Sequence, residues 1–170
     1  MNDTSFSANL VEDRPSESSG DHTDAPVSSQ SAQSESDKTA ERLGRILRDL
    51  GDAFNNHDFD AVRALKFYVS RYFTADFRDL GIPIIRGWDE YVAVGEKMAT
   101  TPPRISIEAK EITVDVDMVE GKAEFSVFAV QSAEDTNLKL GAQNLFTWRR
   151  EWGRWLLRHH TKIRNLDMAI

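Results

Sequence analysis

The chain has 170 residues, which is enough for one domain of ordinary size and a terminal tail. It contains no cysteine, and this excludes disulfide bonds, thiol catalysis and cysteine-based zinc sites. The net charge of −7 belongs entirely to residues 1 to 37, which hold eight acidic side chains and one basic one, whereas the rest of the chain is neutral.

Residues 1 to 37 are predicted to be a disordered acidic tail. They include ten serines and only isolated apolar residues, so they cannot bury enough surface to offset the entropy lost on ordering. The basic start and apolar run of a secretory signal are missing, as is the arginine-rich composition of a transit peptide. No stretch approaches the roughly 20 apolar residues that span a bilayer. A cytoplasmic location without membrane contact is therefore expected, with a single domain over residues 38 to 170.

Three helices are predicted in the first half of this domain. Over residues 38–55, apolar side chains recur at intervals of three and four, which is the spacing of one helix face. The letters NNHD end this helix, and Asp58 is a suitable N-cap for a short second helix through Leu65. The letters SRYFTADFRDLG then predict a strand that runs into a turn. The letters GWDEYVAVGEKMAT give the third helix, which ends before a double proline.

The rest of the chain is predicted to be sheet. Residues 104–117 alternate in polarity, but the parity of the apolar residues changes at Lys110 and Glu111, which indicates a β-bulge. Three further strands follow after short turns, at residues 124–132, 138–149 and 154–164. Neighbouring strands joined by short turns pair antiparallel. The expected fold is α+β, a curved antiparallel sheet forming a cone with the three helices packed on its concave face.

Three pieces of the sequence carry a family resemblance: the helix end AFNNHDFDAV, the helix start GWDEYV and the closing hairpin NLFTWRREWGRWLLRHHTK. In this order they resemble the SnoaL-like, nuclear-transport-factor-like (NTF2-like) superfamily, which includes ketosteroid isomerase, polyketide cyclases and scytalone dehydratase. The resemblance covers about residues 38 to 166. It implies the cone fold with a cavity under the helices, but one fold of this kind hosts enzymes, binding proteins and assembly modules.

The local similarity is greatest to scytalone dehydratase. The letters AQNLFTW look like its strand bearing a pocket asparagine, which falls on Asn144. Where the dehydratase has a tyrosine followed by an aspartate, this chain has Phe54 followed by Asn55, and another pocket tyrosine falls on Phe77. The catalytic histidines of the dehydratase have no counterpart, because residues 104–132 contain no histidine. An amide cannot accept a proton as a carboxylate does, so the dehydratase activity itself is not predicted.

Six side chains are predicted to contact a ligand in the cavity. Asn55, at the end of the first helix, either points along the cavity wall or caps the helix. Asn144 shares its strand face with apolar residues, so its amide must be satisfied by a ligand, by the backbone or by a buried water. Tyr91 has a hydroxyl that needs a polar partner. The set is completed by aromatic residues that are otherwise plain core, namely Phe73, Trp88 and Phe146.

The letters RHHTK supply the candidate proton carrier. Adjacent residues of a strand face opposite sides, and His159 shares its parity with Trp155, Leu157 and Ile163, so His159 is predicted to point into the cavity and His160 outward. A histidine pKa near neutrality suits general acid or base catalysis. The alternative is a core histidine satisfied by a neighbour, and the similarity to the dehydratase favours His160 for the cavity.

The expected function is a SnoaL-like domain that holds a small apolar molecule, of polyketide or terpenoid type, in its cone. If the protein is an enzyme, the expected class is a cofactor-independent isomerase, cyclase or lyase. No metal is expected, because the four histidines lack metal-ligand spacing, and no phosphate-binding loop is present. The alternative is a non-catalytic module of the same fold that serves dimerisation or protein binding.

The closing hairpin interleaves basic and aromatic residues, which is also a feature of nucleic-acid surfaces. Against this interpretation, the domain is neutral overall and strand alternation separates most of the charges from the apolar residues. No nucleic-acid partner is therefore expected. A homodimer formed through the outer face of the sheet is expected instead.

Overall fold

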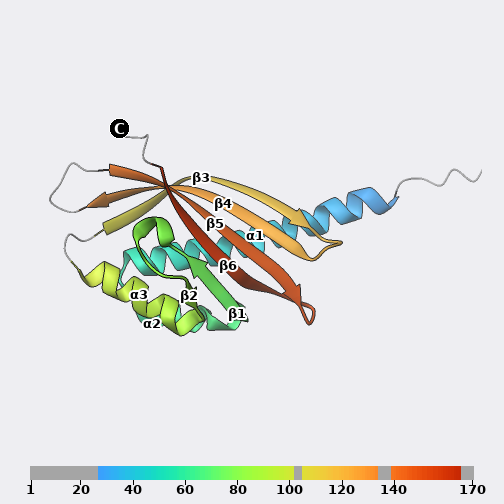
Figure 1. Ribbon diagram of the computed structural model, residues 1–170. Helices are drawn as coiled ribbons and strands as arrows, with labels where there is room; N and C mark the ends of the chain where they lie inside the picture. The colour runs from blue at the N-terminus through green and yellow to red at the C-terminus, as the bar shows by residue number, and fades with distance from the viewer. Residues whose placement is uncertain (1–26, 102–104, 134–138, 166–170) are drawn as a thin grey trace, which may run out of the picture.

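The computed structural model describes residues 27–101, 105–133 and 139–165 (Figure 1). Its helices are α1 (Val27–Asn55), α2 (Phe59–Ala64) and α3 (Trp88–Thr100), with the short 3-10 helices η1 (Leu65–Tyr68) and η2 (Arg78–Leu80). Its strands are β1 (Val69–Asp76), β2 (Ile85–Arg86), β3 (Ile105–Asp117), β4 (Lys122–Ala133), β5 (Lys139–Glu151) and β6 (Arg154–Asn165). No helix in these ranges is both long and apolar enough to cross a membrane.

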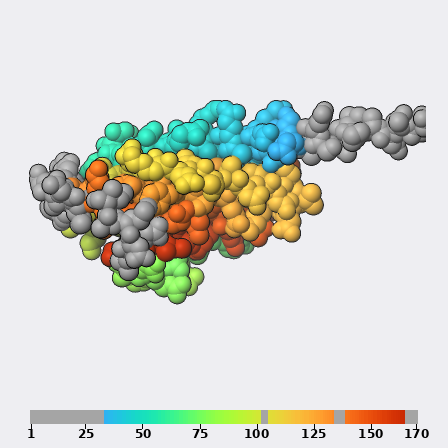
Figure 2. Space-filling model, turned by 90° about the horizontal axis from the view of Figure 1, so that it is seen from above, coloured from blue at the N-terminus to red at the C-terminus, as the bar shows by residue number. Residues whose placement is uncertain are grey.

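The six strands form one curved sheet in the order β2-β1-β6-β5-β4-β3. The helices pack on one face of this sheet, and α1 lies along one side of the strands, next to β3 (Figure 2). The α+β cone predicted from the sequence is thus confirmed. One pair departs from the expected antiparallel pattern, since β1 runs parallel to β6. Residues 77–153 separate these two strands, so no hairpin dictates their relative direction.

The core lies between the helices and the concave face of the sheet. On β1 and just beyond it, Phe73, Ala75 and Phe77 alternate inward and are buried. From the helical side, Leu43 on α1 and Val62 on α2 are almost completely buried. Fully burying an apolar side chain of this size contributes about 1.5–3 kcal/mol, so this layer dominates the stability of the cone.

The first helix begins at Val27, eleven residues before the predicted start at Lys38. In Figure 1 its first turns extend beyond the β3–β4 turn. The Ser36 hydroxyl donates a hydrogen bond to the carbonyl oxygen of Val116 at 3.3 Å, and Thr39 is buried, so contacts with β3 support this part of the helix. Residues 27–37, assigned to the tail by their composition, are therefore helical. The remainder of the predicted tail, residues 1–26, lies outside the described residues.

Two β-bulges shape the antiparallel part of the sheet. The register between β3 and β4 shifts between Ala109 and Glu111, which confirms the bulge predicted there. A second shift lies between β5 and β6, where Thr147 pairs with His159 but Trp148 pairs with Leu157. Residue 158 is therefore an extra residue in β6, and it reverses which face the following side chains occupy.

Candidate functional site

A cavity of about 100 Å³, partly open to solvent, lies between the helices and the concave face of the sheet. Most of its wall is apolar, and it is formed by Phe54, Phe77, Met98, Ala99, Ile105 and Ile107. The polar side chains in the wall are Asn55, Tyr91, Gln131, Asn144, His160 and Lys162. No carboxylate among the described residues lines it. An apolar wall with a few polar groups is typical of small-molecule sites, although these usually measure about 300–1,000 Å³.

His160 is buried in the cavity wall, and both of its ring nitrogens are hydrogen-bonded. Nδ1 lies 3.0 Å from the Tyr91 hydroxyl, and Nε2 lies 3.2 Å from Oδ1 of Asn144. Since Oδ1 can only accept, Nε2 carries the hydrogen, and Nδ1 accepts from the Tyr91 hydroxyl. The ring is stacked on Phe146 with centroids 4.1 Å apart, and the edge of Phe77 meets it at 4.9 Å. These contacts fix both the tautomer and the orientation of His160.

Burial controls the charges in the cavity wall. It lowers the pKa of His160 well below its ordinary value, and the nearby Lys162 and His159 act in the same direction. Burial raises the pKa of the Tyr91 phenol, so both members of this pair are neutral near pH 7. Burial, followed by the charge of Arg164, lowers the pKa of the Lys162 ammonium to about 8.

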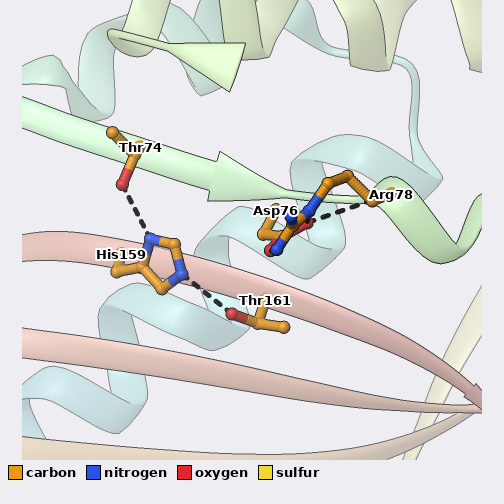
Figure 3. Close-up of polar contacts among 5 residues, drawn as sticks. All are labelled: Thr74, Asp76, Arg78, His159 and Thr161. Carbon is orange, nitrogen blue, oxygen red and sulfur yellow. Dashed lines mark hydrogen bonds and ion pairs between the residues drawn. The ribbon is translucent and has the colours of Figure 1, made fainter. Parts of the chain in front are cut away.

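The predicted orientation of the two adjacent histidines is wrong. His160 faces the cavity, while His159 lies on the opposite face of β6 (Figure 3). There, Nδ1 of His159 is 2.7 Å from the Thr74 hydroxyl and Nε2 is 2.9 Å from the Thr161 hydroxyl. The cause is the extra residue Arg158, which moves every later side chain of β6 to the other face. The histidine that lines the cavity is therefore residue 160 and not residue 159.

Three of the predicted ligand-contacting residues line the cavity, namely Asn55, Tyr91 and Asn144. Phe146 lies behind the wall, stacked on His160. Phe73 and Trp88 are core residues that pack against the Tyr91 ring, with centroids 5.3 Å and 4.9 Å away. These two side chains position Tyr91 and do not line the cavity.

Asn55 neither caps α1 in a left-handed conformation nor leaves its amide free for a ligand. Its Nδ2 donates to the carbonyl oxygen of Ile107 at 2.7 Å, and its Oδ1 accepts from the amide nitrogen of Ile107 at 2.9 Å. The left-handed residue of this corner is His57, with φ 57°. Asn55 therefore fastens the end of α1 to the backbone of β3 at the rim of the cavity.

Lys162 is a charged site residue that the sequence does not reveal. It is 7 % exposed, and it lies opposite Asn144 in the β5–β6 register. Its side chain forms no hydrogen bond or ion pair with any described residue. A lysine in an alternating strand is ordinarily expected to face solvent, so only its shared parity with His160 could have placed it in the cavity.

No protein-family model matches the sequence. No curated protein matches it either. Solved structures do match the fold. An NTF2-like protein with a cystatin-like fold from Novosphingobium aromaticivorans superposes with a TM-score of 0.65 at 14 % identity, covering 86 % of this chain and 94 % of that one.

Two further neighbours carry functional descriptions. A candidate dehydratase of the NTF2-like family from Streptomyces avermitilis has a TM-score of 0.62 at 15 % identity, covering 76 % of this chain and 98 % of that one. A candidate scytalone dehydratase from Novosphingobium aromaticivorans has a TM-score of 0.56 at 16 % identity, covering 81 % and 93 %. The chain therefore has the NTF2-like fold that its sequence resembles, and at these identities the likeness extends to the fold alone.

Proposed function

We propose that the cavity binds a small, largely apolar molecule, of polyketide or terpenoid type, and that a cofactor-independent proton transfer takes place on it. The observation that carries this proposal is the hydrogen-bonded row of Tyr91, His160 and Asn144 in a mostly apolar wall. Apolar walls hold the body of a ligand while a few polar groups fix its orientation. The neighbours described as candidate dehydratases support an isomerase, cyclase or lyase on this fold.

The proposed chemistry follows from the protonation states of Tyr91 and His160. The Tyr91 hydroxyl donates its hydrogen to Nδ1 of His160, so its oxygen is free to accept a hydrogen bond from the ligand. A proton that leaves the ligand moves to the Tyr91 oxygen while the Tyr91 hydrogen moves to His160. Asn144 holds the ring in the tautomer that this relay needs. Tyr91 is thus the residue that contacts the ligand, and His160 is the base behind it.

A non-catalytic module for dimerisation or protein binding is the second candidate. The observation in its favour is that both nitrogens of His160 are already satisfied and that no described carboxylate lines the cavity. The cavity volume, below the usual range for ligand sites, favours it as well. Under this alternative, His160 has a structural role only, because its hydrogen bonds hold the neighbouring core side chains in place. Both functions are proposed for a cytoplasmic protein.

The test is native mass spectrometry of the full chain purified from its native producer, followed by comparison of two variants of α3. Ala99 lines the cavity, whereas Ala93 is exposed on the same helix. Ala99→Phe should fill the cavity and abolish the bound mass, and Ala93→Phe should retain it. Turnover of the identified ligand that falls about 10²-fold or more in Tyr91→Phe would support the relay.

Two results would count against ligand binding. One is a chain that carries no small molecule in any preparation, and the other is a bound mass that survives Ala99→Phe. A ligand that binds in the cavity and is never converted would favour the non-catalytic alternative.

A further inference from the structure

Lys162 is a buried cation without a counter-charge in the described part of the chain. Its side chain lines the cavity, is 7 % exposed, and forms no hydrogen bond or ion pair with a described residue. Lys162 pairs with Asn144 in the strand register, and both side chains line the cavity on the inner face of the sheet. Burying a charge without a partner costs several kcal/mol, and burial accordingly lowers the pKa of Lys162 to about 8.

The groups around Lys162 on the inner face are neutral or cationic. His160 and Arg164 follow the same parity of β6, and Tyr91 on α3 lines the same cavity. Burial lowers the pKa of His160 and raises the pKa of Tyr91, so neither contributes a negative charge near neutral pH. The charge of Arg164 acts against the Lys162 ammonium and adds to the positive potential beside the cavity.

Two carboxylates lie near Lys162 outside the cavity, but neither neutralises its charge. Asp76 and Asp79 share a surface depression with Lys162, but neither forms an ion pair with it. The oxygens of Asp76 instead accept three side-chain hydrogen bonds from Arg78, at 2.6, 2.9 and 3.1 Å (Figure 3). These bonds lower the pKa of Asp76 to about 2. The positive charge of Lys162 therefore remains available to a ligand.

We propose that the cavity takes a small carboxylic acid, whose carboxylate pairs with Lys162 and whose apolar body lies against Phe54 and Phe77. This inference rests on the proposed function and names the chemical class of its ligand. A carboxylate supplies the missing counter-charge, and hydrogen bonds between charged groups are about twice as strong as neutral ones. The side-chain amide of Gln131, also in the wall, offers a further donor. An uncharged molecule of the same shape gains none of the ionic contribution.

Acids and their amides are matched probes for this proposal. Benzoate and benzamide share a ring and a planar head group and differ in charge, and butyrate and butyramide give the same contrast in a smaller body. An apolar cavity of about 150 Å³ is known to accept benzene. The aromatic pair is close to this size and the butyrate pair is smaller, so the probes cover the ligand sizes expected for a partly open cavity of about 100 Å³. All four are measured by isothermal titration calorimetry on the full chain at pH 7.

The decisive variant is Lys162→Met, which keeps an unbranched side chain and removes the charge. Lys139→Met, at an exposed lysine of β5, is the matched control for net charge. In the unmodified chain and in the control, at least one acid should bind about tenfold more tightly than its amide. In Lys162→Met, acid and amide should bind equally.

The preference for the acid should also decline as the pH rises from 7 to 10, because the ammonium with a pKa of about 8 loses its proton. Tyr91 and His160 keep their charge states in this window. Equal binding of acid and amide to the unmodified chain would overturn the carboxylate assignment, and so would acid binding that survives Lys162→Met. Either result leaves the proposed small-molecule function standing. If none of the four probes binds, the carboxylate assignment fails, whereas the proposed function is decided separately by the bound mass and its response to Ala99→Phe.

Discussion

His160 links the stability of the fold to pH, because its ring is buried without a charge. Burial holds its pKa well below 6.5 in the folded chain, whereas in the unfolded chain the pKa is close to 6.5. Between these values the unfolded chain binds a proton that the folded chain does not, so stability falls as the pH drops below about 6.5. Above that pH the ring is neutral in both states and contributes no pH dependence.

Replacing His160 with glutamine should lower the free energy of unfolding at pH 7 by about 1–3 kcal/mol, because the buried Tyr91 hydroxyl loses its acceptor. The variant should also lose much of the pH dependence between pH 7 and 5. His159→Gln is the matched control, since this ring lies on the outer face and is only half-buried, and it should cost less than about 1 kcal/mol. Urea denaturation at pH 5, 6 and 7 measures both. Equal losses in the two variants would contradict the inner position of His160.

At the scale of elements, the two bulges explain why one part of the site was predictable and another was not. In β3, isoleucine and valine occupy the inner face on both sides of the bulge, so the apolar pattern itself changes parity at Lys110. In β6, the inner residues beyond the extra Arg158 are His160 and Lys162. Because both are polar, the alternation of apolar residues carries no sign of the bulge. The inner face of this part of β6 would be recognisable from apolar residues, but the cavity has polar residues there. The orientation of the site residues could therefore not be predicted from the apolar pattern.

The junction between α1 and β3 depends on Asn55, whose amide replaces a strand partner for Ile107. Asn55→Ala should lower the free energy of unfolding by about 1–3 kcal/mol, since two backbone hydrogen-bonding groups lose their partner. It should also speed hydrogen exchange at the Ile107 amide. Asn56→Ala, at an exposed neighbour, is the control and should change stability by less than about 0.5 kcal/mol. Similar losses of unfolding free energy in both variants would show that the Asn55–Ile107 contact does not stabilise the junction.

Helices α1 and α3 approach each other closely where Gly95 meets the ring of Phe54. A Cβ atom at Gly95 would overlap this ring, with one ring carbon at 2.7 Å. Gly95→Ala should therefore push Phe54 into the cavity that both residues line, and weaken ligand binding. The control is Gly51→Ala on α1, where a Cβ meets nothing within 4 Å and should add about 0.5–1 kcal/mol of stability. Thermal unfolding and probe titration of both variants measure these effects. Unchanged ligand binding in Gly95→Ala would mean that the Phe54 ring moves away from the cavity and not into it.

At the scale of the whole molecule, the cone was predictable because element order and strand spacing define it. The length of α1 was not, since its first turns are rich in serine and show no apolar face that a periodicity could detect. The volume of the cavity was not predictable either. It depends on how far rings such as Phe54 and Phe77 fill the space under the helices, and this is a property of three-dimensional packing rather than of any sequence interval.

The outer face of the sheet carries exposed apolar side chains among polar ones. Leu145 on β5 and Ile163 on β6 are 37 % and 38 % exposed. Gln143 of β5 pairs with Ile163 on one side and with the half-buried Phe128 of β4 on the other. The helices cover the opposite face, so this apolar surface has no partner among the described residues. An interface of standard size buries about 1,600 Å² in total, or about 800 Å² of each protomer. The molecule is therefore predicted to form a homodimer through this face.

Leu145→Glu places a charge in the middle of the predicted interface and should convert the dimer into a monomer at tens of micromolar, because a buried carboxylate without a partner is costly. Val119→Glu is the matched control, since Val119 is 98 % exposed in the turn between β3 and β4 and should leave the dimer intact. Light scattering measures the mass of each variant. A monomeric unmodified chain at this concentration would refute the dimer, and a dimer that survives Leu145→Glu would place the interface on another surface.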